Sequence, residues 1–348
     1  MQILVPYSLK GLTLKNRIVM APMASNLATE RGYPSPRSLA HYQERARGGV
    51  GLVIVEATLI SRQPPVSDGR LGLWSDDTVG PLSELAAAIR EGGAVPAIQV
   101  ADLSLRASGR KPADLTEDEI KTIREGYVRA VKRAVQAGFA AVEFHGAHST
   151  TLADFLSQRG NRRTDAHGRG VGGRARLLTE IVTDVRGAIG QDYPLFCRIN
   201  ADEFTLNGNT PKQTIPLAQS LLRAGVDVLH VSAGGRPEDE GYSQARSIPP
   251  AWMPNGVNVY LAAEVKRATE APVIAVGKLG DPAAAEAVLA SGSADLVALA
   301  RPVLADPDWV RKVEAGRQLA IKRCTCCGRC SELFREKEAV HCVTYAES

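Results

Sequence analysis

Long apolar runs are missing from this 348-residue chain. No window reaches the 18 or more consecutive apolar residues of a membrane-spanning helix, and polar residues interrupt the amino-terminal MQILVPYSLKG before the apolar stretch of a signal peptide can form. A basic tail is also missing, because the net charge is +4 and the arginines are scattered along the chain. We therefore expect a soluble, cytoplasmic protein with neither a membrane nor a nucleic acid as its partner.

Cysteine is nearly absent until the end of the chain. Of the six cysteines, Cys197 alone precedes the last 25 residues. A disulfide framework is typically spread through a small secreted domain rather than gathered at the end of a large one. Five cysteines at short spacing indicate a site where several thiolates converge on a metal.

The G-x-G-x-x-G motif that a dinucleotide fold needs after its first strand is missing too, which disfavours an open doubly wound sheet. What is present is an alternation of short apolar runs with longer amphipathic stretches, typical of strands buried on both faces of a parallel sheet. The strand candidates are 17–21, 51–55, 95–100, 141–145, 195–200, 228–232, 273–276 and 296–300. Eight strands with interleaved helices predict an α/β fold, a closed (β/α)8 TIM barrel over residues 1–321, with 322–348 as a cysteine-rich metal-binding appendage.

Several helices carry their own start signals. Thr116 followed by Glu119 forms a capping-box pattern. Thr210 and Asp281 each precede a proline at the first helical position. Apolar residues recur at helical spacing along 177–189, which predicts a helix with one buried face.

In a barrel of this kind the active site lies at the carboxyl ends of the strands. The last two strands are followed by Gly277-Lys278 and by Ala300-Arg301. Glycine lets backbone N–H groups approach an anion, and the two cations supply countercharge, so a phosphate site is expected here. Taken singly, each pair is equally compatible with a tight turn and a solvated cation.

Two histidines, His145 and His148, stand at the end of the fourth strand candidate and three residues beyond it. If the chain turns there, both imidazoles point into the barrel mouth and can hold one oxygen of a substrate or a metal ion. A metal is disfavoured because no carboxylate or third histidine lies at an obvious ligand spacing.

The order of motifs along the chain resembles that of the Old Yellow Enzyme family of FMN oxidoreductases. The resemblance rests on APMA, HYQERARGGVGLVIVEAT, AGFAAVEFHGAH, NRRTDAHG, IAVG and DLVALARPVLADPDW, and it runs from about Met1 to Trp309. It implies bound FMN and a small-molecule substrate. The residues that it implies around the flavin ring are Pro22, Met23, Ala24, Ala57, Gln99 and Arg198; around the phosphate, Gly277, Lys278, Ala300 and Arg301; and at the substrate oxygen, His145 and His148. Arg198 would also stabilise negative charge that develops on the reduced ring.

The cysteine pattern Cys324-x2-Cys327-x2-Cys330-x11-Cys342 is similar to the segment that holds a [4Fe–4S] cluster in the trimethylamine dehydrogenase and 2,4-dienoyl-CoA reductase branch of that family. The first three spacings are closer to those of the amine dehydrogenase. Cys326 is surplus to this set, and a ligand set that uses it stays open. A structural zinc ion bound by four thiolates is the alternative.

Three positions depart from the family pattern. Thr150 stands where the family has a tyrosine proton donor, and a threonine hydroxyl is a far weaker acid than a phenol. Asp102 follows Gln99 where members usually continue Q-L-x-H, and Ser243 aligns with a histidine of the dienoyl reductases. The substrate pocket is thus expected to differ while the flavin pocket is kept. No cysteine lies near the first strand, which excludes a cysteinyl-flavin bond there.

Three functions fit these features. The leading one is an ene-reductase-like hydride transfer from FMN to an electron-poor C=C bond whose conjugated oxygen is held by the two histidines. The cysteine spacing favours an amine or C–N oxidising flavoenzyme that passes electrons out through the cluster. A non-catalytic flavin–cluster electron carrier within a complex is the third.

The electron partner is expected to be NAD(P)H acting directly at the flavin, or a separate redox protein. Members of the iron–sulfur branch continue into nucleotide-binding domains, whereas this sequence ends at Ser348. The oligomeric state is open, with a homo-oligomer among the options.

Overall fold

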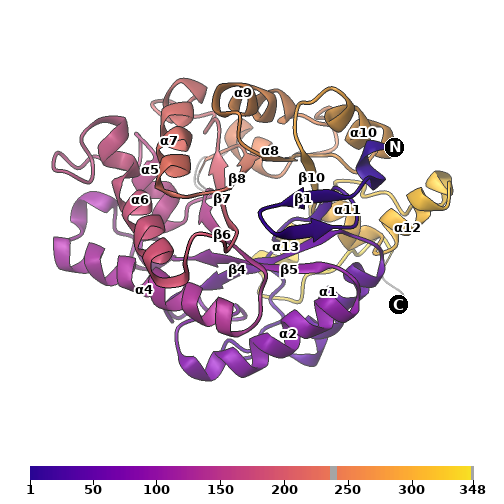
Figure 1. Cartoon of the computed structure of the whole chain (residues 1–348), viewed down its shortest axis with the longest axis horizontal. Helices are drawn as coiled ribbons and strands as arrows, with labels where there is room; N and C mark the ends of the chain where they lie inside the picture. The colour runs from indigo at the N-terminus through magenta and orange to yellow at the C-terminus, as the bar shows by residue number, and fades with distance from the viewer. Residues whose placement is uncertain (236–240, 346–348) are drawn as a thin grey trace.

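The computed structural model describes residues 1–235 and 241–345, so the last three residues of the predicted 322–348 segment lie outside the described residues. Its centre is a closed barrel of parallel strands in the order β10-β3-β4-β5-β6-β7-β8-β9 (Figure 1). Pairing of β10 with β3, with Val297 opposite Ile18, closes the sheet and confirms the predicted barrel over the open alternative. The strands are β1 Tyr7–Leu9, β2 Leu12–Leu14, β3 Ile18–Met20, β4 Leu52–Leu59, β5 Val95–Ala101, β6 Ala141–Gly146, β7 Leu195–Asn200, β8 Val228–Ser232, β9 Val273–Val276 and β10 Leu296–Leu299.

Helices surround the barrel and connect successive strands. They are α1 Pro36–Arg47, α2 Val79–Glu91, α3 Ser104–Ser108, α4 Glu117–Gln136, α5 Thr151–Leu156, α6 Gly170–Ile189, α7 Pro211–Ala224, α8 Tyr242–Ser247, α9 Val259–Thr269, α10 Pro282–Ala290, α11 Arg301–Ala305, α12 Trp309–Glu314 and α13 Arg329–Arg335. Short 3-10 turns lie at Gln2–Leu4, Asp76–Thr78, Pro112–Asp114 and Gln318–Ala320. No helix in the described part of the chain is long and apolar enough to cross a membrane.

The helices begin where the capping signals predict. At α4, the Thr116 hydroxyl accepts from the Glu119 amide at 3.2 Å while the Glu119 carboxylate accepts from the Thr116 amide at 2.8 Å. At α10, Asp281 accepts from the amides of Ala283 and Ala284. Each cap satisfies amides that the helix itself leaves without partners. In α6 the predicted apolar stripe is buried from Leu177 to Val185, as expected for a helix packed on a barrel wall.

Strand β4 is longer than the sequence predicts. The run 51–55 was expected to end before Glu56, but β4 continues to Leu59 and its pairing with β5 shifts between Val55 and Thr58. Glu56 and Ala57 therefore lie within the strand and not after it. The polar Glu56 is tolerated inside because Ser25 and Tyr42 donate hydrogen bonds to its carboxylate.

The interior of the barrel is layered along its axis. Its lower part is an apolar cluster that contains Leu52, Ile54, Phe196 and Leu296. The antiparallel β1–β2 hairpin packs Leu9 and Leu14 into the same cluster and covers the amino-terminal end of the barrel. Polar side chains are consequently confined to the upper part, towards the carboxyl ends of the strands, where the active site of such barrels lies.

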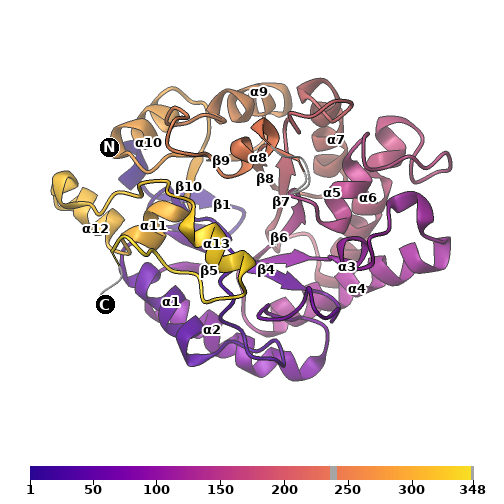
Figure 2. The same ribbon diagram turned by 180° about the vertical axis from the view of Figure 1, so that it is seen from behind.

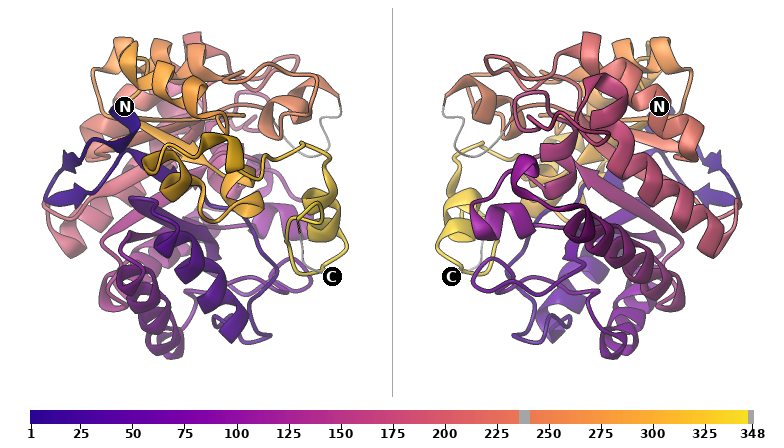
Figure 3. Two further views of the ribbon diagram at one scale, coloured as in Figure 1. Left: turned by 90° about the vertical axis from the view of Figure 1, so that its right-hand side faces the viewer. Right: turned by 90° about the vertical axis from the view of Figure 1, so that its left-hand side faces the viewer.

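The C-terminal segment folds back across the carboxyl-terminal mouth of the barrel, with α13 in front of the strands in Figure 2. Figure 3 places this segment and the β1–β2 hairpin at opposite ends of the barrel. Hydrogen bonds attach the C-terminal segment to the loop that follows β3. The Val340 amide donates to the Ser25 carbonyl at 2.9 Å, and Asn26 Nδ2 donates to the carbonyls of Phe334 and Glu338 at 3.0 Å. The segment thus helps to form whatever site lies in the mouth.

Candidate active site

A cavity of about 490 Å³ lies between the carboxyl ends of the strands and the C-terminal segment. All of the residues predicted around the flavin ring, the phosphate and the substrate oxygen line it, and two of the predicted thiolates do so as well. These lining residues are Pro22, Met23, Ala24, Ala57, Gln99, His145, His148, Arg198, Gly277, Lys278, Ala300, Arg301, Cys324 and Cys330. One cavity therefore brings together residues from β3 to the end of the chain.

A hydrogen-bonded chain of polar residues forms the layer beneath this cavity. The buried carboxylate of Glu143 accepts from Gln99 Nε2 at 2.7 Å, and its other oxygen lies 2.7 Å from His230 Nδ1. Glu143 and His230 have no exposed surface. Arg198 stands opposite His230 in the strand register, and its Nε has no hydrogen-bond partner among the described residues.

These groups set the charge of Arg198. Burial lowers the pKa of the Arg198 guanidinium, and the Glu143 carboxylate raises it in compensation. An arginine starts from so high a pKa that it keeps its charge. The cavity thus receives a fixed cation with an unpaired N–H from the barrel interior.

His145 and His148 lie on the same side of the cavity, with ring centroids 5.4 Å apart. His145 is opposite Arg198 in the β6–β7 register. Two successive left-handed residues, His148 at φ +53° and Ser149 at φ +63°, turn the chain so that His148 Nε2 comes within 2.9 Å of Ser232 Oγ. Left-handed conformations at residues other than glycine are strained and are typically retained at functional sites.

Both imidazoles are neutral at pH 7. Burial lowers the pKa of each well below 6.5, and the positive charge of Arg198 lowers it further. His145 Nδ1 is buried with no hydrogen-bond partner among the described residues. A neutral imidazole can donate one N–H bond, so the pair is suited to holding an oxygen and poorly suited to supplying a proton.

Thr150 and Asp102, two of the departures from the family pattern, have structural partners. The Thr150 hydroxyl donates to the His145 carbonyl at 2.5 Å and accepts from the Ala153 amide, which caps α5. Asp102 accepts from the Thr151 hydroxyl at 2.5 Å and so joins the end of β5 to the start of α5. Neither residue lines the cavity. Both side chains position the turn that carries the two histidines.

Ser243 does not line the cavity either. Its hydroxyl donates to the Glu203 carbonyl at 2.6 Å and accepts from the Gly235 amide at 2.7 Å. It therefore links the chain after β8 to the segment at Glu203, and its proton is committed to that carbonyl.

The predicted phosphate residues come together at the ends of β9 and β10. Gly277 has φ +127°, and a Cβ there would lie 2.9 Å from Asn258 Nδ2, so no larger residue fits. Lys278 Nζ donates to the Ala251 carbonyl at 2.6 Å, and an Arg301 Nη donates to the Pro249 carbonyl at 2.7 Å. The two cations thus hold the 249–251 loop beside the cavity.

The C-terminal thiolates lie at one edge of the same cavity. Cys324, Cys326 and Cys330 line it, together with Arg301. Four cysteines at these spacings are a donor set that can bind an iron–sulfur cluster or a structural zinc ion. The residues present therefore fit either group by the chemistry of their donors.

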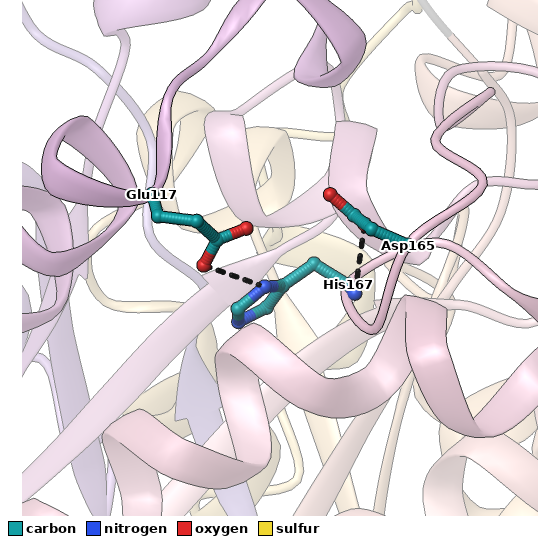
Figure 4. A group of neighbouring side chains, drawn as sticks. All are labelled: Glu117, Asp165 and His167. Atoms are coloured by element: carbon teal, nitrogen blue, oxygen red, sulfur yellow. Dashed lines mark hydrogen bonds and ion pairs between the residues drawn. The ribbon is translucent and has the colours of Figure 1, made fainter.

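Glu117, Asp165 and His167 lie close together on the outside of the barrel and present ligand atoms that could hold a metal ion (Figure 4). Its cation is already supplied by Arg163, which forms ion pairs with both Asp165 and Glu117. Arg163 also donates to the Leu115 carbonyl at 2.6 Å. We interpret this cluster as an ion-pair group that joins the start of α4 to the 161–168 loop, and not as a metal site.

Sequence reasoning missed Glu143 and His230, which carry the layer beneath the cavity, and Arg70, Arg106 and Phe334 on its walls. A signal exists for the first two, because an ionisable residue inside an apolar strand such as AVEFHG or VLHVS needs a buried partner. The other three lie in loops, in the short helix α3 or in the C-terminal segment, where no local pattern indicates a cavity.

Comparison with known proteins gives a family match over nearly the whole barrel. The model described as the NADH:flavin oxidoreductase / NADH oxidase family matches residues 2–112 and 105–320. The chain is 38% identical over 338 residues to NADH oxidase of Thermoanaerobacter brockii, covering 91% of this chain and 51% of that protein. It is 36% identical over 324 residues to NADPH dehydrogenase of Halalkalibacterium halodurans, covering 88% of this chain and 92% of that protein. The chain therefore spans about half the length of the first relative and most of the second.

The solved structures that are similar to this one include chains about twice its length and chains of about its own length. A 2-naphthoyl-CoA reductase complex has a TM-score of 0.90 at 26% identity and covers 98% of this chain and 56% of its own. The 6-hydroxypseudooxynicotine amine oxidase of Pseudomonas geniculata N1 has a TM-score of 0.83 at 26% identity, covering 98% and 53%. Morphinone reductase in complex with tetrahydroNAD has a TM-score of 0.72 at 25% identity, covering 91% of each chain. The first two matches thus take in more of this chain than the third.

Proposed function

Because this chain belongs to the NADH:flavin oxidoreductase / NADH oxidase family, whose members are FMN-dependent oxidoreductases, we propose that it reduces an electron-poor C=C bond conjugated to an oxygen. The observation that supports this most is the pair of neutral imidazoles, His145 and His148, at the wall of a cavity that also contains the predicted flavin residues. A non-catalytic electron carrier has no use for two neutral imidazoles at the wall of its flavin cavity, which makes it the less favoured function.

The residues present fit an FMN. Arg198 Nε is buried without a partner, as expected of a donor that awaits a ring atom, and Gly277 leaves room that a Cβ would take away. Arg198 and Gln99 would lie against the ring, while Pro22, Met23, Ala24 and Ala57 would supply the remaining contacts. Gly277, Lys278, Ala300 and Arg301 would hold the phosphate. When bound, FMN would supply the hydride-transfer chemistry of the reaction.

The protein groups would act on charge and position. His145 and His148 would donate hydrogen bonds to the conjugated oxygen and stabilise the negative charge that it gains, a contribution on the order of 2–4 kcal/mol for each donor. Arg198 would stabilise negative charge on the reduced ring. The proton for the second carbon would come from water or another group, because the Thr150 hydroxyl is committed to the His145 carbonyl.

A second candidate is the oxidation of an amine, with electrons leaving through an iron–sulfur cluster. It is favoured by the position of Cys324 and Cys330 on the cavity wall. Cys324, Cys327, Cys330 and Cys342 would bind the cluster, which supplies one-electron transfer when bound. NAD(P)H or a separate redox protein would be the electron partner of either reaction.

Anaerobic reduction of the purified flavoprotein separates the two functions. NADH and NADPH are tested first as donors, and the reduced flavin is then mixed with an enone such as cyclohexenone. We expect reoxidation by the enone and no flavin reduction by simple amines. Flavin that amines reduce and enones do not reoxidise would establish the second candidate and overturn the first.

A further inference from the structure

The charged side chains that line the cavity are almost all cationic. The cationic residues are Arg70, Arg106, Arg198, Lys278, Arg301, Arg323 and Arg335. Among the described lining residues, Asp281 is the one with an acidic side chain. Asp281 caps α10 and pairs with Arg323 at 2.7 Å, so it balances that cation alone. A bound FMN phosphate would neutralise Lys278 and Arg301. The cavity would still hold more positive charge than these anions can balance.

Arg70 is the most unusual of the remaining cations. Only 8% of its surface is exposed, and its guanidinium lies 4.6 Å from the centre of the Phe334 ring, on which it stacks. Within the described residues its side chain has no hydrogen bond or ion pair. The nearby carboxylate of Glu56 is already bonded by Ser25 and Tyr42. The guanidinium donors of Arg70 therefore have no acceptor among these residues, and the Glu56 charge offsets part of the cost of burying the cation.

A second cation faces the same region. Arg106 is exposed on α3, lines the cavity, and likewise has no hydrogen bond or ion pair with a described residue. Burial lowers the pKa of the Arg70 guanidinium, Glu56 raises it, and the charge of Arg106 lowers it further. Burial and Arg198 lower the pKa of His145, and Arg70 contributes in the same direction. The two arginines therefore repel each other on the side of the cavity where the histidines lie.

We propose that Arg70 and Arg106 form an oxyanion-binding subsite beside His145 and His148, and that the molecule reacting in this cavity carries a carboxylate or a phosphate. The inference rests on the proposed function in taking the histidine side of the cavity as the place of reaction. Two guanidiniums can bind one oxyanion through paired N–H bonds. The anion would offset the repulsion between the two cations and would accept hydrogen bonds from the N–H groups of Arg70. A substrate carboxylate is the occupant we expect, and a phosphate of the nicotinamide nucleotide is the other source of the same chemistry.

The subsite also selects against positive charge. An ammonium group placed beside Arg70, Arg106 and Arg198 would be repelled by their positive charge. This disfavours a cationic amine as the substrate, even though an amine oxidase shares the fold at a TM-score of 0.83.

Three probes of one shape test the proposal: benzoate, benzamide and benzylamine, which are an anion, a neutral amide and a cation at pH 7.5. Binding to the oxidised flavoprotein is followed by the change in flavin absorbance, so turnover is not required. We expect benzoate to bind about tenfold or more tighter than benzamide, the gain typical of a charge-assisted bond to a buried cation, and benzylamine to bind most weakly.

Variants locate the effect. Arg70→Met keeps an apolar stem against Phe334 and removes the charge, and it should bring benzoate to within about threefold of benzamide. Arg106→Gln should reduce the preference for benzoate by a smaller factor. Because Arg106 is exposed, this variant should fold normally, so it still tests the subsite if Arg70→Met fails to fold. Arg129→Gln is the matched control, because Arg129 is exposed on α4, away from this cavity. It removes the same charge and should leave the preference unchanged.

The nucleotide source is tested on the same variants by the rates at which NADH and NADPH reduce the flavin. If Arg70→Met and Arg106→Gln abolish benzoate selectivity, the anion belongs to the substrate. If they spare it and slow NADPH about tenfold more than NADH, the anion is a nucleotide phosphate and the subsite stands. Equal binding of benzoate and benzamide by the unaltered protein, with nucleotide rates unchanged in the variants, would overturn the inference. Protein that contains no flavin would instead overturn the proposed function.

Discussion

Glu143 occupies the position from which one carboxylate reaches most of the polar layer under the cavity. It binds Gln99 and His230 directly and opposes the loss of charge at Arg198. A negative charge at that depth acts against the negative charge that a flavin gains on reduction. If Arg198 acts as proposed, Glu143 sets how strongly it stabilises the reduced ring.

Glu143→Gln should raise the reduction potential of the bound flavin. The amide keeps hydrogen bonds to Gln99 and His230 but removes the negative charge, so Arg198 acts on the ring with less opposition. We expect a rise of about 30 mV or more, which corresponds to about 1.4 kcal/mol for two electrons. Spectroelectrochemical titration measures it. Glu180→Gln, in an ion-pair group outside the barrel, is the control, and a lower potential in Glu143→Gln would contradict this account.

His148 and Thr150 should differ sharply in their effect on catalysis. His148→Ala would remove the proposed donor to the substrate oxygen and should lower turnover roughly a hundredfold, with flavin content intact. Thr150→Ala removes the cap of α5 and should cost about 1 kcal/mol of stability with a modest change in turnover. Enone-dependent oxidation of NADPH and urea unfolding are the two measurements. A Thr150→Ser variant restores the cap, and a Thr150→Ala variant as inactive as His148→Ala would show that the hydroxyl has a direct catalytic role.

At the scale of elements, the C-terminal segment completes the cavity. It reaches the 25–26 loop through backbone and amide hydrogen bonds and covers Arg70 with Phe334. Lys337 adds an exposed ion pair with Asp68 at 3.2 Å, which contributes little by comparison. The thiolates that follow the last barrel helix are thereby brought to the cavity wall.

The protein prepared without oxygen should contain about four irons and four sulfides per chain. Cys327→Ala should remove them, because a cluster ligand is lost, whereas Cys326→Ser should retain them as the matched control. Iron, sulfide and zinc analysis of the two variants checks this. One zinc and no sulfide per chain would decide for the structural metal, and loss of iron in Cys326→Ser would assign the surplus cysteine to the ligand set.

At the scale of the whole molecule, buried histidines make the fold sensitive to acid. Burial holds the pKa of His145, His148 and His230 below 6.5 in the folded protein. Below pH 6.5 the unfolded chain therefore binds protons that the folded protein refuses, and stability falls as the pH falls. Glu56 opposes this, because burial raises the pKa of its carboxyl and the folded protein holds that proton more readily.

The free energy of unfolding should consequently decrease between pH 6.5 and pH 5, by about 1.4 kcal/mol per pH unit for each histidine that stays neutral. Urea unfolding followed by tryptophan fluorescence at pH 7, 6 and 5 measures the slope. His230→Gln, which can still donate to Glu143, should reduce the slope by about one proton. Stability that rises towards pH 5 would be inconsistent with the neutral histidines.

The sequence by itself determined the eight strands, several helix starts and the strand ends at which the cavity residues lie. These features depend on neighbours a few residues apart: an unbroken apolar run makes a buried strand, and Thr116 or Asp281 satisfies amides in the next turn. The order of motifs also identified the family. Where a local signal misled, as at Glu56, the residue had distant partners that the run itself does not contain.

The tertiary structure alone decided which side chains meet. Glu143 and His230 are 87 residues apart, and Asn26 and Phe334 are 308 apart, yet each pair is in contact. The commitment of Thr150 and Ser243 to backbone carbonyls, the burial of Arg70 under Phe334 and the return of the C-terminal thiolates to the mouth also follow from such contacts. They could not be predicted because the periodicity of a sequence specifies which face of an element is buried, whereas the partner on that face is set by how distant elements pack.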